Sequence, residues 1–316
     1  MKHVFTQSFL NSYRSLLVLL AMVLSGMAGC DDDSAGRTSQ AYSSIPGSQT
    51  APGSPLRVRL ISAEQYHNAI AYVFGADVAE RVTPPLPPFP RTDGLLASGA
   101  ASVGLTSDQV SQIQQAAATI AAVVVDEEHR DVLLPCPRSE QTFATDCARA
   151  FLASAGRLLL RRPLSHGRLE QLQSVAESAG ERLDGFYEGL AIALESLLIS
   201  PDFLFIIDRA EEDVTRPGRR RLDAFSLASR WSFFLWTAPP DSTQLDAAEQ
   251  GLLAEPAPRA RELARLLTSP RLESGLRSFF DDMFAFDEFD SLAKDPMVYP
   301  AVTGATLRDA REQTLR

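Results

Sequence analysis

Apolar residues recur at helical spacing in almost every segment after residue 62, and this pattern constrains the fold more than any other feature of the chain. Ser62 stands three residues before Gln65, which is a capping-box spacing, and Tyr66, Ile70 and Phe74 follow at helical intervals. Further helices are expected from Thr106 or Ser107 to Glu128, from Ala148 to Leu160, after the caps Ser165 and Asp184, and over Leu222–Trp236, Thr243–Gln250, Pro258–Leu267, Arg271–Phe284 and from Thr303 onward. No segment shows convincing strand alternation, so the expected fold class is all-α, with multi-helix bundle-like domains.

The first thirty residues have the order of an exported lipoprotein signal. Lys2 and Arg14 precede an apolar run over 15–24, which is too short to span a bilayer comfortably. The stretch Leu24-Ser25-Gly26-Met27-Ala28-Gly29-Cys30 then resembles a lipobox, whose last residue is the lipid-modified cysteine. We therefore expect a signal peptide over 1–29, lipidation of Cys30, and a membrane-anchored lipoprotein of the cell envelope facing the periplasm or the cell surface. An ordinary cleaved signal peptide with an incidental cysteine is the alternative.

Composition shifts suggest the domain boundaries of the mature chain. Residues 30–56 are rich in turn-forming residues and lack apolar periodicity, which predicts a disordered tether. Helical domains are expected over 57–130, over 131–210 with two cysteines, and over 219–316. The last is expected to be incomplete, because its helical pattern runs to the final residue.

The mature chain is acidic, which argues against a role with nucleic acids. Removing the signal takes away Lys2 and Arg14 and no acid, and leaves 28 basic against 40 acidic side chains. Phosphate binding depends on clustered Lys and Arg, and the sequence shows no such cluster.

Two cysteines remain after the lipidated one, and an exported protein can keep them oxidised. Cys136 and Cys147 enclose a polar segment, and a disulfide between them would stabilise the fold by roughly 2–3 kcal/mol. Two free buried thiols are the main alternative. A zinc site is less favoured, because His129 is the only histidine nearby.

Several segments resemble the planctomycete-type (PSD) domains of unknown function, a multi-domain envelope protein family. The segments are Leu222–Trp236 with Pro239-Pro240-Asp241, Arg161-Arg162-Pro163-Leu164, Leu197–Phe205, Leu266–Arg271, and Gln65-Tyr66-His67-Asn68. The resemblance covers most of the mature chain and places Cys136 and Cys147 where that family has a cysteine pair. It differs at Tyr72, where members usually carry an acid, and near Asp282-Met283, where they usually carry a Gln-Trp pair.

What the resemblance implies about function is limited. Members usually continue into further domains, so this chain is expected to be a truncated form or a fragment. Many occur beside or fused to haem-binding modules, which implies an envelope redox or surface-assembly context and a haem-bearing envelope protein as a partner.

The chemistry-bearing motifs give no catalytic prediction. The sequence has no Cys-x-x-Cys-His, phosphate-binding glycine loop, His-Glu-x-x-His or Gly-x-Ser-x-Gly. Glu64 and His67 form one Glu-x-x-His pair, whereas a di-iron bundle needs two. His129-Arg130-Asp131 matches a kinase triplet without any other kinase element, and we regard it as coincidence. No catalytic residue and no cofactor are predicted.

An acidic segment near the end is the candidate metal site. Its carboxylates could bind a hard cation such as Ca²⁺, although the spacing is not that of an EF-hand. The candidate ligands are Asp281, Asp282, Asp287, Glu288 and Asp290. Interleaved phenylalanines favour the alternative, in which the aromatic rings pack and the acids stay solvated.

Two further groups have open interpretations. Trp231, Phe234 and Trp236 could stack on sugars, but at helical spacing they more often belong to a core. Arg161 and Arg162 could hold an anion, although pairing with Glu195 or Asp202 is favoured.

The sequence therefore favours a lipid-anchored binding or assembly component of the envelope. The alternative is an accessory subunit of a redox or hydrolytic system whose active centre lies on a haem-bearing partner or in missing C-terminal domains. Carbohydrate binding is a third hypothesis.

Overall fold

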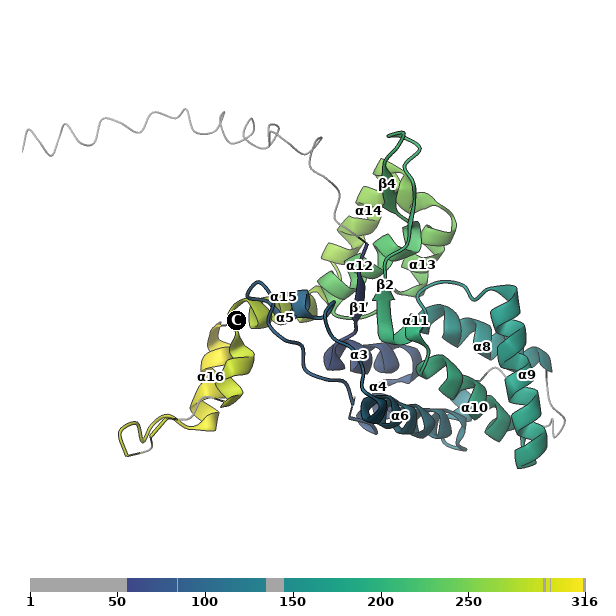
Figure 1. Ribbon diagram of the computed structural model, residues 1–316, viewed down its shortest axis with the longest axis horizontal. Coiled ribbons are helices and arrows are strands. Elements are labelled where there is room, and N and C mark those ends of the chain that lie inside the picture. Colours follow the sequence, from purple (N-terminus) through teal and green to yellow (C-terminus); the bar gives the residue numbers. More distant parts are fainter. Residues whose placement is uncertain (1–55, 84, 135–144, 292–293, 296, 315–316) are drawn as a thin grey trace, which may run out of the picture. The chain divides into compact units, whose positions relative to one another are not determined.

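A computed structural model describes residues 56–83, 85–134, 145–291, 294–295 and 297–314 (Figure 1). These residues belong to one compact unit, Leu56–Arg316, which begins where the predicted tether ends. The predicted signal peptide, Cys30 and Cys136 lie outside the described residues. No helix in the described part of the chain has the length and apolarity needed to cross a membrane.

The described residues are mainly helical, as the all-α prediction requires. The first helices are α3 (Ala63–Phe74), α4 (Ala76–Glu80), α5 (Leu96–Gly99), α6 (Ser107–Val125) and α7 (Arg130–Leu133). They are followed by α8 (Thr145–Leu159), α9 (His166–Leu183), α10 (Phe186–Leu198) and α11 (Pro201–Leu204). The C-terminal part contains α12 (Ala224–Trp236), α13 (Ser242–Glu249), η1 (Leu252–Ala254), α14 (Pro256–Leu267), α15 (Leu272–Met283), η2 (Phe286–Ser291) and α16 (Gly304–Thr314).

Most helix starts follow the capping rules that the sequence indicated. Ser62 and Gln65 form a reciprocal capping box at α3, and Gly75 ends that helix at a φ of 107°. Ser165 caps α9 as predicted. Asp184 was predicted to cap α10, and this was wrong. It ends α9 in the left-handed region at a φ of 55°, and Gly185 begins α10.

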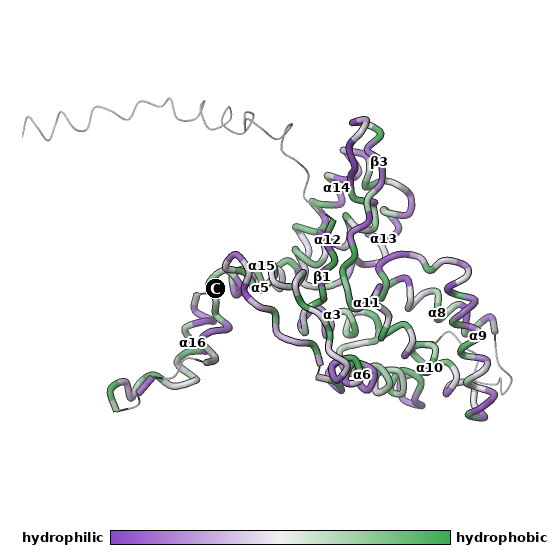
Figure 2. The backbone as a smooth tube through the Cα atoms, viewed as in Figure 1, coloured by the Kyte–Doolittle hydropathy of each residue, from purple (hydrophilic) through white to green (hydrophobic). Residues whose placement is uncertain are grey.

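One hydrophobic core spans both predicted N-terminal domains. It includes the apolar faces of α3, α6, α8, α9 and α10, and α10 packs against both α9 and α6 (Figure 1). The tube of α9 carries both hydrophilic and hydrophobic colours, as expected for a helix with one buried face (Figure 2). Gly189 permits close contact of α10 with α9, because a Cβ there would lie 2.2 Å from the Ala176 carbonyl oxygen.

Four short strands, which the sequence did not predict, form two antiparallel pairs. β1 (Val58–Leu60) pairs with β2 (Phe205–Ile207), and β3 (Ala210–Glu212) pairs with β4 (Arg220–Leu222). Each has only three residues, too few to produce a recognisable alternation of polar and apolar residues. The first pair joins the start of the folded body to the end of α11.

The C-terminal helices enclose two smaller hydrophobic clusters. Trp236 and Leu266 belong to one, and Ala228 and Leu253 to the other. α15 packs against α12 at Gly275, where a Cβ would lie 2.0 Å from the Leu235 carbonyl oxygen. Only glycine therefore fits this crossing without a shift of one helix.

Candidate interaction surface

α15 exposes an apolar stripe that resembles a core-facing helix side. Residues at positions i, i+3, i+4, i+7 and i+8 are all apolar, which is the pattern of a helix face that packs against a neighbour. Their exposed fractions are 48% for Leu276, 40% for Phe279, 37% for Phe280, 42% for Met283 and 48% for Phe284. The stripe therefore faces solvent in the described part of the chain.

Aromatic contacts extend the stripe at both ends. Phe234 on α12 is 64% exposed, and its ring centroid lies 6.1 Å from that of Phe279. Phe280 and Phe284 stack at 5.8 Å, and Phe284 contacts Phe286 at 5.7 Å. These six side chains, Phe234, Leu276, Phe279, Phe280, Met283 and Phe284, are called the aromatic face below.

Neighbouring charges are paired within the chain. Arg277 binds Glu273 and Glu312, and Arg311 binds Asp281. The pairs Arg277–Glu312 and Arg311–Asp281 join α15 to α16. The side chains of the aromatic face itself are uncharged, and such a face suits an apolar surface.

The acidic segment predicted as a metal site lies beside this face and binds arginine. Arg91 donates to Asp282 at 3.1 Å and to Asp287, and lies 3.7 Å from Glu288. Asp282 also accepts the backbone N–H groups of Leu96 and Ala97 at the start of α5. These contacts give the acids a structural role. The side chain of Asp290 lies outside the described residues, and metal binding stays a prediction.

The tryptophans that could have stacked on sugars are largely internal. Trp236 is 2% exposed and donates its indole N–H to the Leu266 carbonyl at 3.1 Å. Trp231 is half-buried and packs against both C-terminal clusters. Phe234 is the member of this group that faces solvent.

An arginine lies between two aromatic rings where α3 meets the C-terminal helices. The Arg271 guanidinium lies 4.4 Å from the Tyr72 ring centroid and 5.2 Å from that of Trp236, and its buried Nη1 has no hydrogen-bond partner. The Tyr72 hydroxyl accepts the backbone N–H of Ser242 at 3.3 Å. Tyr72 is thus adjacent to the Arg271 cation. A carboxylate at position 72 could have formed an ion pair with it.

A histidine near the end of α6 forms an ionic cluster that the sequence analysis missed. His129 is 7% exposed, and its ring nitrogens lie 2.8 Å from Asp126 and 2.7 Å from Asp77. These two hydrogen bonds raise the pKa of His129, and the pKa values of Asp77 and Asp126 are lowered. Asp126, Glu128 and His129 also place three potential metal-ligand atoms within 4.8 Å of one another. Two carboxylates beside one imidazole favour a protonated, doubly paired histidine.

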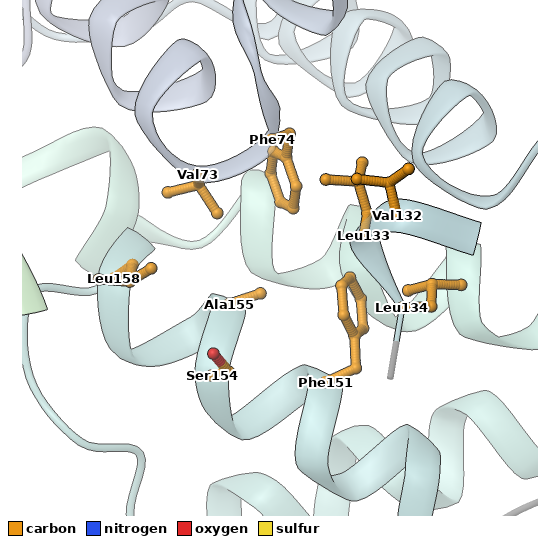
Figure 3. Close-up of a pocket in the computed structure, with 9 residues that line it drawn as sticks. All are labelled: Val73, Phe74, Val132, Leu133, Leu134, Phe151, Ser154, Ala155 and Leu158. Carbon is orange, nitrogen blue, oxygen red and sulfur yellow. The ribbon is translucent and has the colours of Figure 1, made fainter. Parts of the chain in front are cut away.

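A cavity of about 300 Å³ lies between α3, α7 and α8 (Figure 3). Its lining is apolar except for Ser154, and Phe74 and Phe151 project into it from α3 and α8. The described residues that line it include no titratable side chain.

Two family models match the chain. PSD5, "Protein of unknown function (DUF1595)", matches residues 147–208, and PSD4, "Protein of unknown function (DUF1592)", matches residues 222–316. This confirms the predicted resemblance to the planctomycete-type family. After these matches, residues 147–208 are called the PSD5 domain below and residues 222–316 the PSD4 domain. No curated protein and no solved structure matches the chain.

In the PSD5 domain, Arg161 is a buried structural residue. It donates to the carbonyl oxygens of Leu159 at 3.2 Å, Phe203 at 3.0 Å and Phe205 at 2.8 Å. Burial lowers its pKa to about 10. The predicted ion pairs with Glu195 or Asp202 side chains are not formed, because the guanidinium reaches backbone carbonyls instead.

Arg162 and Cys147 are the other predicted residues of the PSD5 domain. Arg162 links this domain to the PSD4 domain, because it pairs with Asp223, the N-cap of α12, at 3.2 Å. Cys147 lies in the first turn of α8 and is largely buried, and its pairing with Cys136 stays a prediction because Cys136 lies outside the described residues. The aromatic face belongs wholly to the PSD4 domain.

Proposed function

We propose that this protein is a lipid-anchored component of the cell envelope that binds another envelope protein through the aromatic face of its PSD4 domain. The observation that supports the proposal is the helical stripe of α15, which has the composition of a buried helix side and is about 40–50% exposed. The six side chains of the face are all uncharged, so a partner needs an apolar surface.

The anchor in this proposal is Cys30. Its place after a short apolar run and small residues supports lipidation. Cys30→Ala is expected to move the protein from the membrane fraction to the soluble fraction of cells and to abolish incorporation of labelled palmitate. Retention of Cys30→Ala in the membrane fraction with unchanged labelling would contradict the anchor.

The contact surface is tested by the size of the native complex. In mild detergent the wild-type protein is expected to migrate on a native gel as a complex larger than the monomer. The double variant Phe280→Ser, Phe284→Ser is expected to migrate as the monomer, because two rings of the face are lost. A matched control, Val214→Ser, changes an 81% exposed side chain on the β3–β4 hairpin and should leave the complex intact.

The composition of the complex then distinguishes the partners. Two copies of this chain would indicate self-association, and a lipid-only assembly would indicate a membrane contact; either result would overturn the proposed protein partner. A haem-bearing partner would be recognised by its Soret absorbance in the purified complex. Equal migration of the wild type and the double variant would contradict the assigned surface.

A further inference from the structure

A buried carboxylate lies where β1 meets α12. The Asp208 side chain is 1% exposed and accepts hydrogen bonds from Arg230 Nε at 3.0 Å and Arg230 Nη2 at 2.5 Å. It also accepts the backbone N–H of Arg57 at 3.0 Å. One guanidinium and one backbone amide therefore occupy this carboxylate, which lowers its pKa.

A second guanidinium, that of Arg59, lies near Asp208 and interacts with its charge without a direct ion pair in the described residues. Arg59 lies on β1 opposite Ile206, its side chain is largely buried, and its Nε is inaccessible to solvent and without a hydrogen-bond partner. No ion pair joins Arg59 to an acid in the described part of the chain. Burial lowers the pKa of Arg59, the charge of the Asp208 carboxylate raises it, and the charges of Arg230 and Arg57 lower it, so that the net shift is downward.

The local charge is therefore positive in a chain whose formal net charge is −10. Arg59 lies near the positive charges of Arg230 and Arg57 and the negative charge of Asp208, so three arginines share one carboxylate and leave an excess of two positive charges. The other acids nearby are engaged: Asp202 binds Arg209 at 3.1 Å, and Asp223 binds Arg162. A largely buried guanidinium without an anion is costly, because it has lost water and gained no partner.

The site is open on one side. Arg57 is exposed and the Arg230 side chain is 32% exposed, so a solute can reach the cluster from solvent. The planar fork of a guanidinium matches two oxygens of a tetrahedral oxyanion, and two unneutralised charges match a dianion.

We propose that Arg57, Arg59 and Arg230 form a binding site for a phosphate group that carries two negative charges, either free phosphate or a phosphate monoester on a lipid headgroup. Arg59 supplies an Nε–H that has no hydrogen-bond partner, and Arg230 is held in place by Asp208. The site lies on β1 and α12, and it is independent of the aromatic face.

The test is calorimetric titration of the full chain with inorganic phosphate in a phosphate-free buffer. The wild type is expected to bind, Arg59→Gln to bind at least about tenfold more weakly, and Arg57→Gln to show a smaller loss. Arg261→Gln removes an exposed charge elsewhere, on α14, and should match the wild type. No phosphate binding by the wild type, or equal affinities for the Arg59→Gln and Arg261→Gln variants, would overturn the site.

Thermal unfolding separates this role from a structural one. Without phosphate, Arg59→Gln should unfold at the wild-type temperature or above, because an unpaired buried charge is removed. Phosphate should raise the unfolding temperature of the wild type and leave that of Arg59→Gln unchanged. A lower unfolding temperature for Arg59→Gln, with the same phosphate-induced rise as the wild type, would mean that Arg59 only supports the fold.

Phosphatidylcholine vesicles with and without phosphatidic acid identify the source of the phosphate. Binding that requires both phosphatidic acid and Arg59 would assign a lipid headgroup. Binding of free phosphate without vesicle binding would assign a soluble phosphate. Vesicle binding that does not depend on Arg59 would count against the site.

Discussion

α10 and α15 carry similar apolar patterns, yet one is buried and the other faces solvent. Leu190, Leu194 and Leu198 of α10 are 0% exposed, because α9 and α6 cover them. The corresponding stripe of α15 contacts α12 at Phe234, and Phe279 and Phe284 remain 40% and 48% exposed. In the described residues, the same apolar pattern is therefore covered by neighbouring helices in α10 and left exposed in α15.

The largest expected difference concerns truncation of one side chain in each helix. Leu194→Ala should lower the free energy of unfolding by about 2–5 kcal/mol, because it leaves a cavity in a closed core. Phe284→Ala should cost less than about 1 kcal/mol, because much of the ring is already in water. Urea denaturation followed by circular dichroism measures both, and equal losses would mean that the face of α15 is covered.

The crossing of α15 with α12 provides a second test. Gly275→Ala should cost about 1–3 kcal/mol, because the new Cβ would overlap the Leu235 carbonyl oxygen. Gly304→Ala is the matched control in α16, where the nearest atom would be the flexible Arg308 side chain at 3.6 Å. Equal denaturant midpoints for the two variants would show that α15 does not depend on this contact.

His129, which lies outside the PSD4 domain, should make the stability of the protein depend on pH. Its pKa is raised, so its protonated form stabilises the fold fully below the ordinary imidazole value of about 6.5 and loses this effect as the pH rises through the folded-state pKa. The unfolding temperature of the wild type should therefore fall relative to that of His129→Gln as the pH rises above about 6.5. Parallel curves for the two proteins would rule out the ionic cluster.

The smallest expected effect is at Tyr72 of α3, whose ring contacts Arg271 of the PSD4 domain. Tyr72→Glu should place a carboxylate beside Arg271 and give a coupling of about 0.5 kcal/mol in a double-mutant cycle with Arg271→Gln. Tyr72→Gln is the uncharged control. A coupling energy indistinguishable from that of the control would show that the two side chains do not form an ion pair.

Local features of the fold could be predicted from the sequence, because they depend on residues close together in the chain. The capping box of Ser62 and Gln65 and the stop at Gly75 are examples. The partners of Asp282 could not be predicted, since Arg91 lies 191 residues away in the sequence. The same limitation applies to Arg161, whose carbonyl partners come from α11 and β2, and to the three-residue strands.

The exposure of the aromatic face also could not be predicted from the sequence. Periodicity identifies Leu276 to Phe284 as one side of a helix, but it predicts burial equally well within the chain or against a partner. Only the exposure of these side chains in the structure distinguishes the two. The acids beside them were predicted as a metal site, because the sequence does not reveal that they pair with Arg91 and Arg311. Those pairs depend on the tertiary structure.

Site-specific photocross-linking in cells that make the protein tests the central claim most directly. A photoreactive phenylalanine analogue replaces Phe280 in one variant and Val214 in the control. A covalent adduct with one envelope protein, identified by mass spectrometry, is expected from position 280 and none from position 214. No adduct from position 280, or the same adducts from both positions, would contradict the assignment of the PSD4 aromatic face as the contact surface.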